Sequence, residues 1–330
     1  MINKSNFTDV MNENDTMEKV RRHCIDKNAW DEYRKMYQES KECVFTNVLP
    51  YPIQIEIELN GTCNYRCQSC NYRMDIGSDK RPTISLETFT ELVKDGVPKG
   101  LKVVRFNHHN EPLLKRDIGD YIRVAKQNGI LDTYLSTNGS MLDDEMIESL
   151  IDSGLDRLQV SIDAMTEKTY TMLRPGGDFN KVISNTKKFL KIRNERNKEL
   201  PTLRVNFVKQ KENVNELDSF VEYWKTEGVD SIGVQKYSDW QNVKEDGGYE
   251  DLEFHCSFPY NLLVVRYTGD VLACCMFFSD KMVIGNIYKN SISEMWNGSV
   301  MQNLRRLSES KDGWKKHPIC RKCVKSIVTI

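Results

Sequence analysis

Apolar and polar residues alternate in the segment IQIEIEL, at residues 53–59. A period of two is typical of a β-strand, because successive side chains of a strand point to opposite faces of its sheet. Five further strand-like runs begin near Leu101, Asp132, Arg157, Leu203 and Asp230. The pattern therefore predicts six strands within residues 51–240.

A helical pattern of apolar residues separates each of these strands from the next. The helical stretches are residues 86–94, 118–127, 143–152, 180–193 and 215–226. Strands that alternate with helices are typical of βα units around a parallel sheet. Six units are too few for a closed eight-stranded barrel, so we expect an α/β fold with a partial, TIM-like (β/α)6 barrel; an open doubly wound sheet has the same local pattern. In both architectures the chemistry lies at the carboxyl ends of the strands.

The two ends of the chain have different compositions. Residues 1–50 are highly charged and rich in helix formers, which predicts an extension of one or two amphipathic helices packed outside the barrel. A polar, glycine-containing linker is expected at 241–251. After it, NLLVVRY, the turn Thr268-Gly269-Asp270 and VLACCMFF predict a β-hairpin, and a helix is expected over 292–307. We expect the barrel at 51–240 and a small hairpin-plus-helix domain at 241–330.

The charges along the chain nearly cancel. The 330 residues include 47 Lys plus Arg and 48 Asp plus Glu, which gives a formal net charge of -1. This balance provides no overall basic field for nucleic acid. No apolar run approaches the ~20 residues that cross a bilayer, and the polar N-terminus lacks the apolar region of a secretory signal. We expect a cytoplasmic protein without a membrane or nucleic-acid partner.

Ten cysteines are unusual in a chain of this kind. In a reducing compartment, clustered cysteines indicate metal ligands or redox groups rather than structural disulfides. Cys24 and Cys43 stand apart, and we expect both to be ordinary buried or half-buried thiols. The other eight form two groups, Cys63, Cys67 and Cys70, and then Cys256, Cys274, Cys275, Cys320 and Cys323.

The first group, CNYRCQSC, follows the first strand directly. A cubic 4Fe-4S cluster normally takes four thiolates, one for each iron. Three local thiolates leave one iron open, and an open iron can chelate the amino and carboxylate groups of a small molecule. A zinc site with a fourth ligand from elsewhere would have a similar pattern.

This motif resembles that of the radical S-adenosylmethionine (radical SAM) superfamily, and the resemblance extends over residues 51–240. It implies a 4Fe-4S cluster on Cys63, Cys67 and Cys70. In that family the cluster passes an electron to bound S-adenosylmethionine, and the 5'-deoxyadenosyl radical that results abstracts a hydrogen atom from the substrate. An external electron donor such as flavodoxin or ferredoxin is expected as a partner.

Three more segments resemble the family, in family order, at predicted strand ends. FNHHNEPLL, residues 106–114, resembles its Gly-Gly-Glu-Pro segment and implies that Glu111 accepts hydrogen bonds from the S-adenosylmethionine ammonium. STNG, residues 136–139, implies that Asn138 lies near the cofactor. In residues 160–177 the resemblance implies that Ser161 meets the ribose hydroxyls or the carboxylate, and that Arg174 pairs with the carboxylate.

The second cysteine group has the order C-x12-G-x4-C, a long gap, and C-x2-C. This resembles the start of the SPASM domain, which carries auxiliary clusters in many radical SAM enzymes. The glycine lets the hairpin turn tightly. Because the chain stops seven residues after Cys323, the match implies one auxiliary 4Fe-4S cluster, the shortened "twitch" form. Its ligands would be Cys256, Cys274, Cys320 and Cys323, with structural zinc as the alternative.

A fully ligated second cluster cannot chelate a substrate, so its natural role is to accept an electron. We therefore expect a two-electron dehydrogenation of a sugar or aminocyclitol alcohol, assisted by a general base. The candidates for the base are His108 and Tyr237, which follow the second and sixth strands.

Three alternatives remain open. The protein could modify a ribosomally made peptide. It could be a radical epimerase, in which Cys275 returns a hydrogen atom to the substrate. It could also be a non-catalytic iron-sulfur or zinc protein.

Overall fold

The computed structural model describes residues 7–9, 13–41, 48–70, 82–237, 255–276, 281–310 and 312–323. Within this part of the chain, ten strands form one sheet in the order β1-β7-β6-β5-β4-β3-β2-β8-β9-β10. The strands are β1 Phe7–Asp9, β2 Gln54–Ile57, β3 Val103–Arg105, β4 Asp132–Thr137, β5 Arg157–Ser161, β6 Thr202–Lys209, β7 Ser231–Lys236, β8 Leu262–Val265, β9 Asp270–Leu272 and β10 Val283–Asn286. The six strands expected from the sequence are confirmed as β2 to β7, and they pair in parallel.

Helices connect these strands as expected. The connecting helices are α3 Leu86–Gly96, α4 Ile118–Gln127, α5 Asp144–Asp152, α6 Glu167–Leu173, α7 Phe179–Glu195 and α8 Leu217–Thr226. Before them come α1 Glu13–His23 and α2 Lys27–Lys41, and after them α9 Phe258–Asn261, α10 Ile292–Asn297 and α11 Ser299–Glu309. Side-chain caps fix several starts, as where Asp143 accepts from the Met146 N–H at α5. None of the helices described here is both long and apolar enough to span a bilayer.

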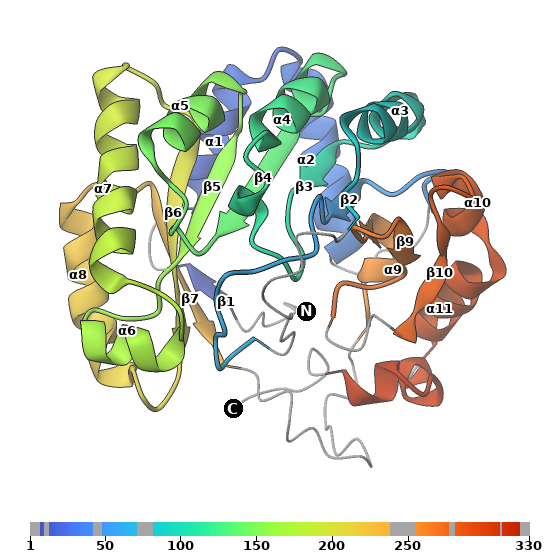
Figure 1. Ribbon diagram of the computed structural model, residues 1–330. Coiled ribbons are helices and arrows are strands. Elements are labelled where there is room, and N and C mark those ends of the chain that lie inside the picture. Colours follow the sequence, from blue (N-terminus) through green and yellow to red (C-terminus); the bar gives the residue numbers. More distant parts are fainter. Residues whose placement is uncertain are drawn as a thin grey trace.

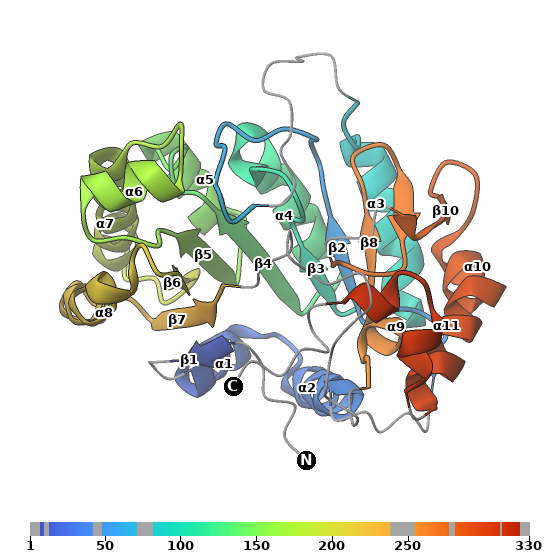
Figure 2. The ribbon, with the colours of Figure 1, turned by 90° about the horizontal axis from the view of Figure 1, so that it is seen from below.

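The parallel strands form an open, partial barrel. Strand β7 pairs on its outer side with β1, and β2 pairs with β8, so the sheet does not close. Helices α3 to α8 cover one face, and α1 and α2 lie on the opposite face (Figures 1 and 2). The N-terminal helices cover the amino ends of the strands, where the Tyr33 hydroxyl donates to Asp132 at 2.9 Å and Lys19 pairs with Asp230. The carboxyl ends remain available for a site.

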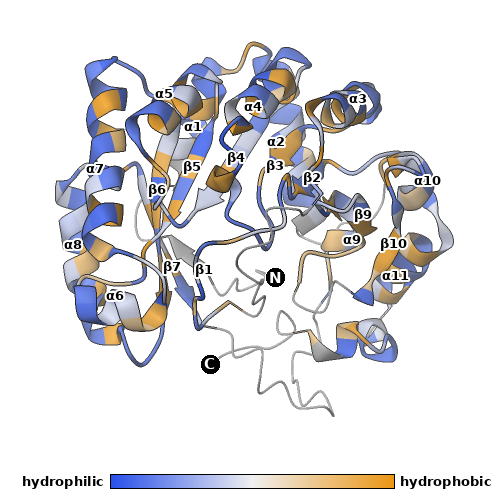
Figure 3. Cartoon of the chain, in the orientation of Figure 1, coloured by the Kyte–Doolittle hydropathy of each residue, from blue (hydrophilic) through white to orange (hydrophobic). Residues whose placement is uncertain are grey.

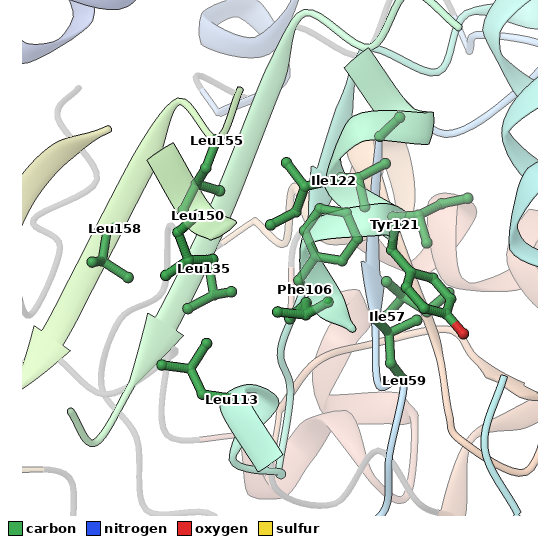
Figure 4. Packing of buried hydrophobic residues seen from close by; sticks show 14 of the residues in the cluster. Ile57, Leu59, Phe106, Leu113, Tyr121, Ile122, Leu135, Leu150, Leu155 and Leu158 are labelled. Atoms are coloured by element: carbon green, nitrogen blue, oxygen red, sulfur yellow. The ribbon is translucent and has the colours of Figure 1, made fainter. Parts of the chain in front are cut away.

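The alternation at residues 53–59 places apolar side chains in the core and acidic side chains on the inner face of the barrel. Ile55, Ile57 and Leu59 are buried in the main hydrophobic core. Figure 4 shows Ile57 and Leu59 in this core, between the sheet and the outer helices. The outer helices carry both hydrophobic and hydrophilic residues (Figure 3), and their buried apolar residues, such as Phe89 of α3 and Ile122 of α4, belong to this core. The intervening Glu56 and Glu58 are also buried, and they lie on the inner face of the barrel.

The C-terminal part continues the sheet of the barrel. The expected hairpin is confirmed as β8 and β9, with Gly269 in the left-handed region at φ 84°. Strand β8 also pairs in parallel with β2, and β10 adds a further antiparallel strand that the sequence did not predict. The boundary expected at residue 241 and the linker 241–251 lie outside the described residues, so the domain division stays a prediction.

One predicted helix was wrong in extent. The stretch 292–307 forms two helices, α10 and α11, because Gly298 between them adopts an extended conformation with ψ 165°. Ser291 and Glu294 form a capping box at the start of α10. Strand β1 and helix α6 were also not expected. Cys24 is half-exposed at the end of α1, and Cys43 lies outside the described residues.

A buried ion pair joins the barrel to the hairpin. Arg266, which follows β8, donates through Nε to Glu58 at 2.8 Å, and the Glu58 side chain is completely buried. We expect Arg266→Met to lower the free energy of unfolding by about 3–5 kcal/mol, because it leaves a buried carboxylate without its counter-ion. Urea unfolding measures the change. The exposed pair of Arg123 with Asp120 is the control, and Arg123→Met should cost less than about 1 kcal/mol. Equal losses in the two variants would contradict the expectation.

Candidate active site and metal centres

The first cysteine group lies in the loop after β2, at the carboxyl ends of the strands. Figure 1 shows this blue loop crossing the strand ends toward α6. The loop is tied to two of the expected segments. The Glu111 N–H donates to the Thr62 carbonyl at 2.8 Å, and the Asn138 side chain donates to Asn64 at 2.8 Å. The fold thus brings these three segments together around the cysteines.

The three thiols perturb one another. Burial raises the pKa of Cys63 to about 12, with further contributions from Glu111, Cys67 and Cys70. Burial also raises the pKa of Cys67, and the charge of Arg174 opposes this shift. Cys70 is exposed at the end of the described stretch. Such a set ionises readily only when a cation neutralises it, which is the situation of thiolates that ligate a metal.

Glu111 is buried to 2% exposure and connects two strand ends. One carboxylate oxygen accepts from the Leu113 N–H at 3.1 Å and the Thr137 hydroxyl at 2.6 Å; the other accepts from the Asn138 N–H at 2.7 Å. Since a carboxylate offers about four acceptor positions, one remains for a ligand. Burial raises the pKa of Glu111, and these three hydrogen bonds oppose the shift.

The raised pKa of Glu111 leads to a prediction about cofactor affinity. An ammonium group binds the ionised carboxylate, so affinity for S-adenosylmethionine should fall as the pH drops through this raised pKa. Glu111→Gln should weaken binding about tenfold, or ~1.4 kcal/mol, and should flatten this pH dependence. Equilibrium dialysis with anaerobically reconstituted protein measures both effects, with the exposed Glu87→Gln as control. Unchanged affinity in Glu111→Gln would contradict this role.

Ser161 and Arg174 lie near the same strand ends. Ser161 is the last residue of β5 and is half-buried, on the face opposite the core residues Val160 and Ile162. Arg174 follows α6 and is buried. Its guanidinium donates twice to Asp163 and lies 3.7 Å from the Cys67 sulfur. Arg174 is thus paired within the protein.

A polar cluster on the inner face adjoins this site. His108 Nδ1 lies 3.5 Å from a carboxylate oxygen of Glu56, and Arg105 contacts the other oxygen at 3.4 Å. His108 Nε2 is buried and has no hydrogen-bond partner among the described residues. The adjacent His109 stacks on it with ring centroids 3.7 Å apart, and burial lowers the pKa of His109 to about 2.

The two candidates for a general base are not neighbours in the sheet. His108 follows β3 and Tyr237 follows β7, and three strands separate β3 from β7. Sequence reasoning missed Glu56, Glu58 and Asn64. The available signal was the acidic half of the alternation at 53–59, since charged residues at every second position of a parallel strand belong on the inner face of a barrel.

The second cysteine group also assembles. Burial raises the pKa of Cys274, and charges on Cys275, Cys256 and Cys323 add to the shift. Burial raises the pKa of Cys320 as well, with contributions from Cys256 and Cys323. The Cys323 N–H donates to the Cys320 carbonyl at 2.9 Å, which closes the C-x2-C turn. Cys256 and Cys323 therefore each lie close enough to both Cys274 and Cys320 for their charges to interact.

Neither cysteine group is arranged around a single metal ion. Within the described ranges, no three His, Cys, Asp or Glu side chains are placed to hold one metal ion. A cubic cluster instead takes one thiolate on each iron, so its ligands surround the cluster rather than a single ion.

Comparison with known proteins identifies the family. The sequence model of the radical SAM superfamily matches residues 57–223, about half of the chain. The chain belongs to the radical SAM superfamily. The model of an iron-sulfur cluster-binding domain, SPASM, matches residues 256–324. The protein is thus a radical SAM enzyme whose cofactors are 4Fe-4S clusters and S-adenosylmethionine.

Curated relatives of this radical SAM enzyme have diverse reactions. A probable GTP 3',8-cyclase of Methanocaldococcus jannaschii is 29% identical over 175 residues, which are 53% of this chain and 56% of that protein. The chain spans about half the length of the cyclases it matches. A tungsten-containing aldehyde ferredoxin oxidoreductase cofactor-modifying protein of Pyrococcus furiosus is 24% identical over 317 residues, 81% of this chain and 86% of that protein.

Solved structures share the fold. SuiB of Streptococcus suis bound to S-adenosylmethionine has a TM-score of 0.65 at 17% identity, and covers 89% of this chain and 76% of its own. SuiB has also been solved with its precursor peptide SuiA. BtrN in complex with AdoMet and 2-DOIA has a TM-score of 0.51 at 19% identity, over 82% of this chain and 92% of its own.

The residues present fit the cofactors that the family implies. Each cysteine group supplies two partly buried thiols whose raised pKa values favour neutralisation by iron. Glu111 keeps one acceptor position for a cationic group beside the first cysteine group. This donor set suits a cluster with a bound amino acid moiety.

Proposed function

We propose that this radical SAM enzyme dehydrogenates an alcohol of a sugar or aminocyclitol. The observation that carries the proposal is the second cysteine group, in which the charges of Cys256 and Cys323 act on both Cys274 and Cys320. Four protein thiolates would leave no iron open for substrate, so this centre suits electron transfer. When bound, the cofactors supply hydrogen-atom abstraction and an acceptor for the second electron.

Residues of this chain are assigned to hold the first cluster, to bind S-adenosylmethionine and to remove a proton. We assign Cys63, Cys67 and Cys70 to the first cluster, and Glu111, Asn138 and Ser161 to S-adenosylmethionine. The hydrogen bonds of Glu111 and Asn138 hold the strand ends around the cysteine loop. Loss of two electrons from an alcohol also releases the hydroxyl proton, which requires a base.

His108 is the better placed of the two candidates for this base. Its Nδ1 faces Glu56, and its buried Nε2 is left without a partner among the described residues. A carboxylate that faces one ring nitrogen holds the proton on that nitrogen and orients the imidazole, which leaves the other nitrogen, here Nε2, unprotonated and able to accept a proton. We therefore assign His108 as general base and Glu56 as its positioning residue.

Isotope labelling tests the proposed function. The anaerobically reconstituted enzyme is given a panel of aminocyclitols and hexoses that carry deuterium on their carbinol carbons. Dehydrogenation predicts a ketone that has lost the carbinol deuterium and the hydroxyl proton, with that deuterium recovered in 5'-deoxyadenosine. If the panel is inert and a short peptide from a neighbouring gene acquires a new crosslink, the enzyme is a peptide maturase. Return of a solvent hydrogen to the carbinol carbon would instead indicate an epimerase.

The base is tested by paired variants. His108→Gln should lower ketone formation by about 10²–10⁴-fold, because a general base contributes that much, and should leave substrate-free cleavage of S-adenosylmethionine unchanged. Tyr237→Phe is the matched comparison and should retain ketone formation. The reverse pattern would assign the base to Tyr237.

A further inference from the structure

The segment after α6 is built against the cysteine loop. The Arg66 N–H donates to the Pro175 carbonyl at 2.8 Å, and the Gln68 N–H donates to the Leu173 carbonyl at 3.0 Å. Gly176 has φ 92°, and a Cβ there would lie 3.0 Å from the Asn64 carbonyl oxygen. These contacts fix the backbone on both sides of Arg174 to the loop that carries Cys67.

The Arg174 side chain is held in one orientation. Its Nε and Nη2 donate to one oxygen of Asp163 at 3.1 and 2.6 Å, and Nη1 lies 3.7 Å from the Cys67 sulfur. Arg174 is 7% exposed and Asp163 is 1% exposed. Asp163 is anchored in turn, because its other oxygen accepts from the Val208 N–H at 2.7 Å and its carbonyl accepts from Asn213 at 2.8 Å.

We propose that Arg174 is a positioning residue of the first cluster, whose N–H bond to the Cys67 thiolate raises the reduction potential of that cluster. The inference rests on Cys67 being a cluster ligand, as assigned above. Hydrogen bonds to ligating sulfurs and nearby positive charge favour the reduced, more negative state of an iron-sulfur cluster. Asp163 balances much of the guanidinium charge, so the directed N–H bond carries the effect.

This assignment differs from the role in binding carboxylate that the family resemblance implied. Two of the guanidinium donors are committed to Asp163, and a third faces sulfur. A buried Arg–Asp pair has no net charge to offer a cofactor carboxylate. Loss of Arg174 should therefore change the potential of the cluster more than the affinity for S-adenosylmethionine.

Redox titration of the holoenzyme, followed by electron paramagnetic resonance, tests the proposal. Arg174→Met should shift the reduction equilibrium of the first cluster about tenfold toward the oxidised form, or about 59 mV for one electron. Asp163→Asn should shift it the opposite way, because it keeps the donor and removes the balancing charge. The double variant Arg174→Met/Asp163→Asn, which buries no unpaired charge, should shift in the same direction as Arg174→Met but by less, because the carboxylate charge is removed together with the donor. The second cluster of each protein is the internal control and should not move.

Affinity for S-adenosylmethionine, from equilibrium dialysis, is measured on the same samples and should stay within about twofold. An unchanged potential in the double variant would overturn the proposal. Affinity reduced tenfold without a shift in potential would assign Arg174 to the cofactor carboxylate. If the Cys67→Ala variant still binds the first cluster, Cys67 is not a cluster ligand and the premise of the proposal is wrong. None of these measurements needs a substrate, so a failure of the proposed dehydrogenation leaves this inference standing.

Discussion

Replacement of Cys70 by alanine is expected to lower 5'-deoxyadenosine formation by at least about 10³-fold, or ~4 kcal/mol of transition-state stabilisation. The loop after β2 supplies three thiols, and the charges of Cys67 and Cys70 add to the effect of burial in raising the pKa of Cys63. Two thiols cannot hold the cluster in place beside Glu111. The measurement is 5'-deoxyadenosine by chromatography after anaerobic reconstitution, with iron content determined on the same sample.

Cys24→Ala is the matched control for this experiment. Cys24 is a half-exposed thiol at the end of α1, whose helix covers the amino ends of the strands. It should leave both iron content and cleavage at the wild-type level. Wild-type cleavage in Cys70→Ala would mean that another residue completes the ligand set.

The Cys323→Ala variant should separate the two centres. Cys323 and Cys320 form the turn that completes the second group, and Cys323 lies within electrostatic reach of Cys274. We expect 5'-deoxyadenosine formation to persist within about tenfold of wild type, while ketone formation is lost, since the second electron has no acceptor. Product analysis by mass spectrometry and iron content together measure this.

Cys275→Ala is the control, because it removes a thiol next to a ligand without removing the ligand. Cys275 packs against Leu262, Val264 and Leu272, apart from the main core that Cys274 adjoins. A dehydrogenase should retain turnover in this variant. Loss of turnover in Cys275→Ala, with normal iron content, would favour the epimerase. Full turnover in Cys323→Ala would refute the redox role of the second centre.

Much of the fold was predictable because its signals are local. Alternation at 53–59 and the helical stretches between the later strands depend only on nearby residues, and β2 to β7 follow from them. The division of residues 292–307 into two helices was less visible, since a glycine within a helical pattern does not by itself indicate a break. Strand β1 is three residues long, and its partner β7 lies more than two hundred residues away.

The features of the candidate site that depend on local spacing were also predictable from the sequence. Spacing of the cysteines and the segments around Glu111 and Asn138 indicated which elements take part, because ligands on one loop remain close in any fold. Contacts between residues that are distant in the chain could not be predicted from the sequence. The approach of Arg174 to Cys67 depends on how α6 packs on the loop, and Glu58 finds Arg266 only because β8 pairs with β2.

The order of the βα units, the two cysteine groups and the expected location of the chemistry at the carboxyl ends of the strands follow from the sequence alone, since each depends on short-range spacing. Which buried charges pair depends on the tertiary fold. Glu56 faces His108, Arg174 is held by Asp163, and the hairpin extends the barrel sheet. A buried charge must find a partner wherever the packed chain provides one, and that partner is chosen by the fold rather than by distance along the sequence.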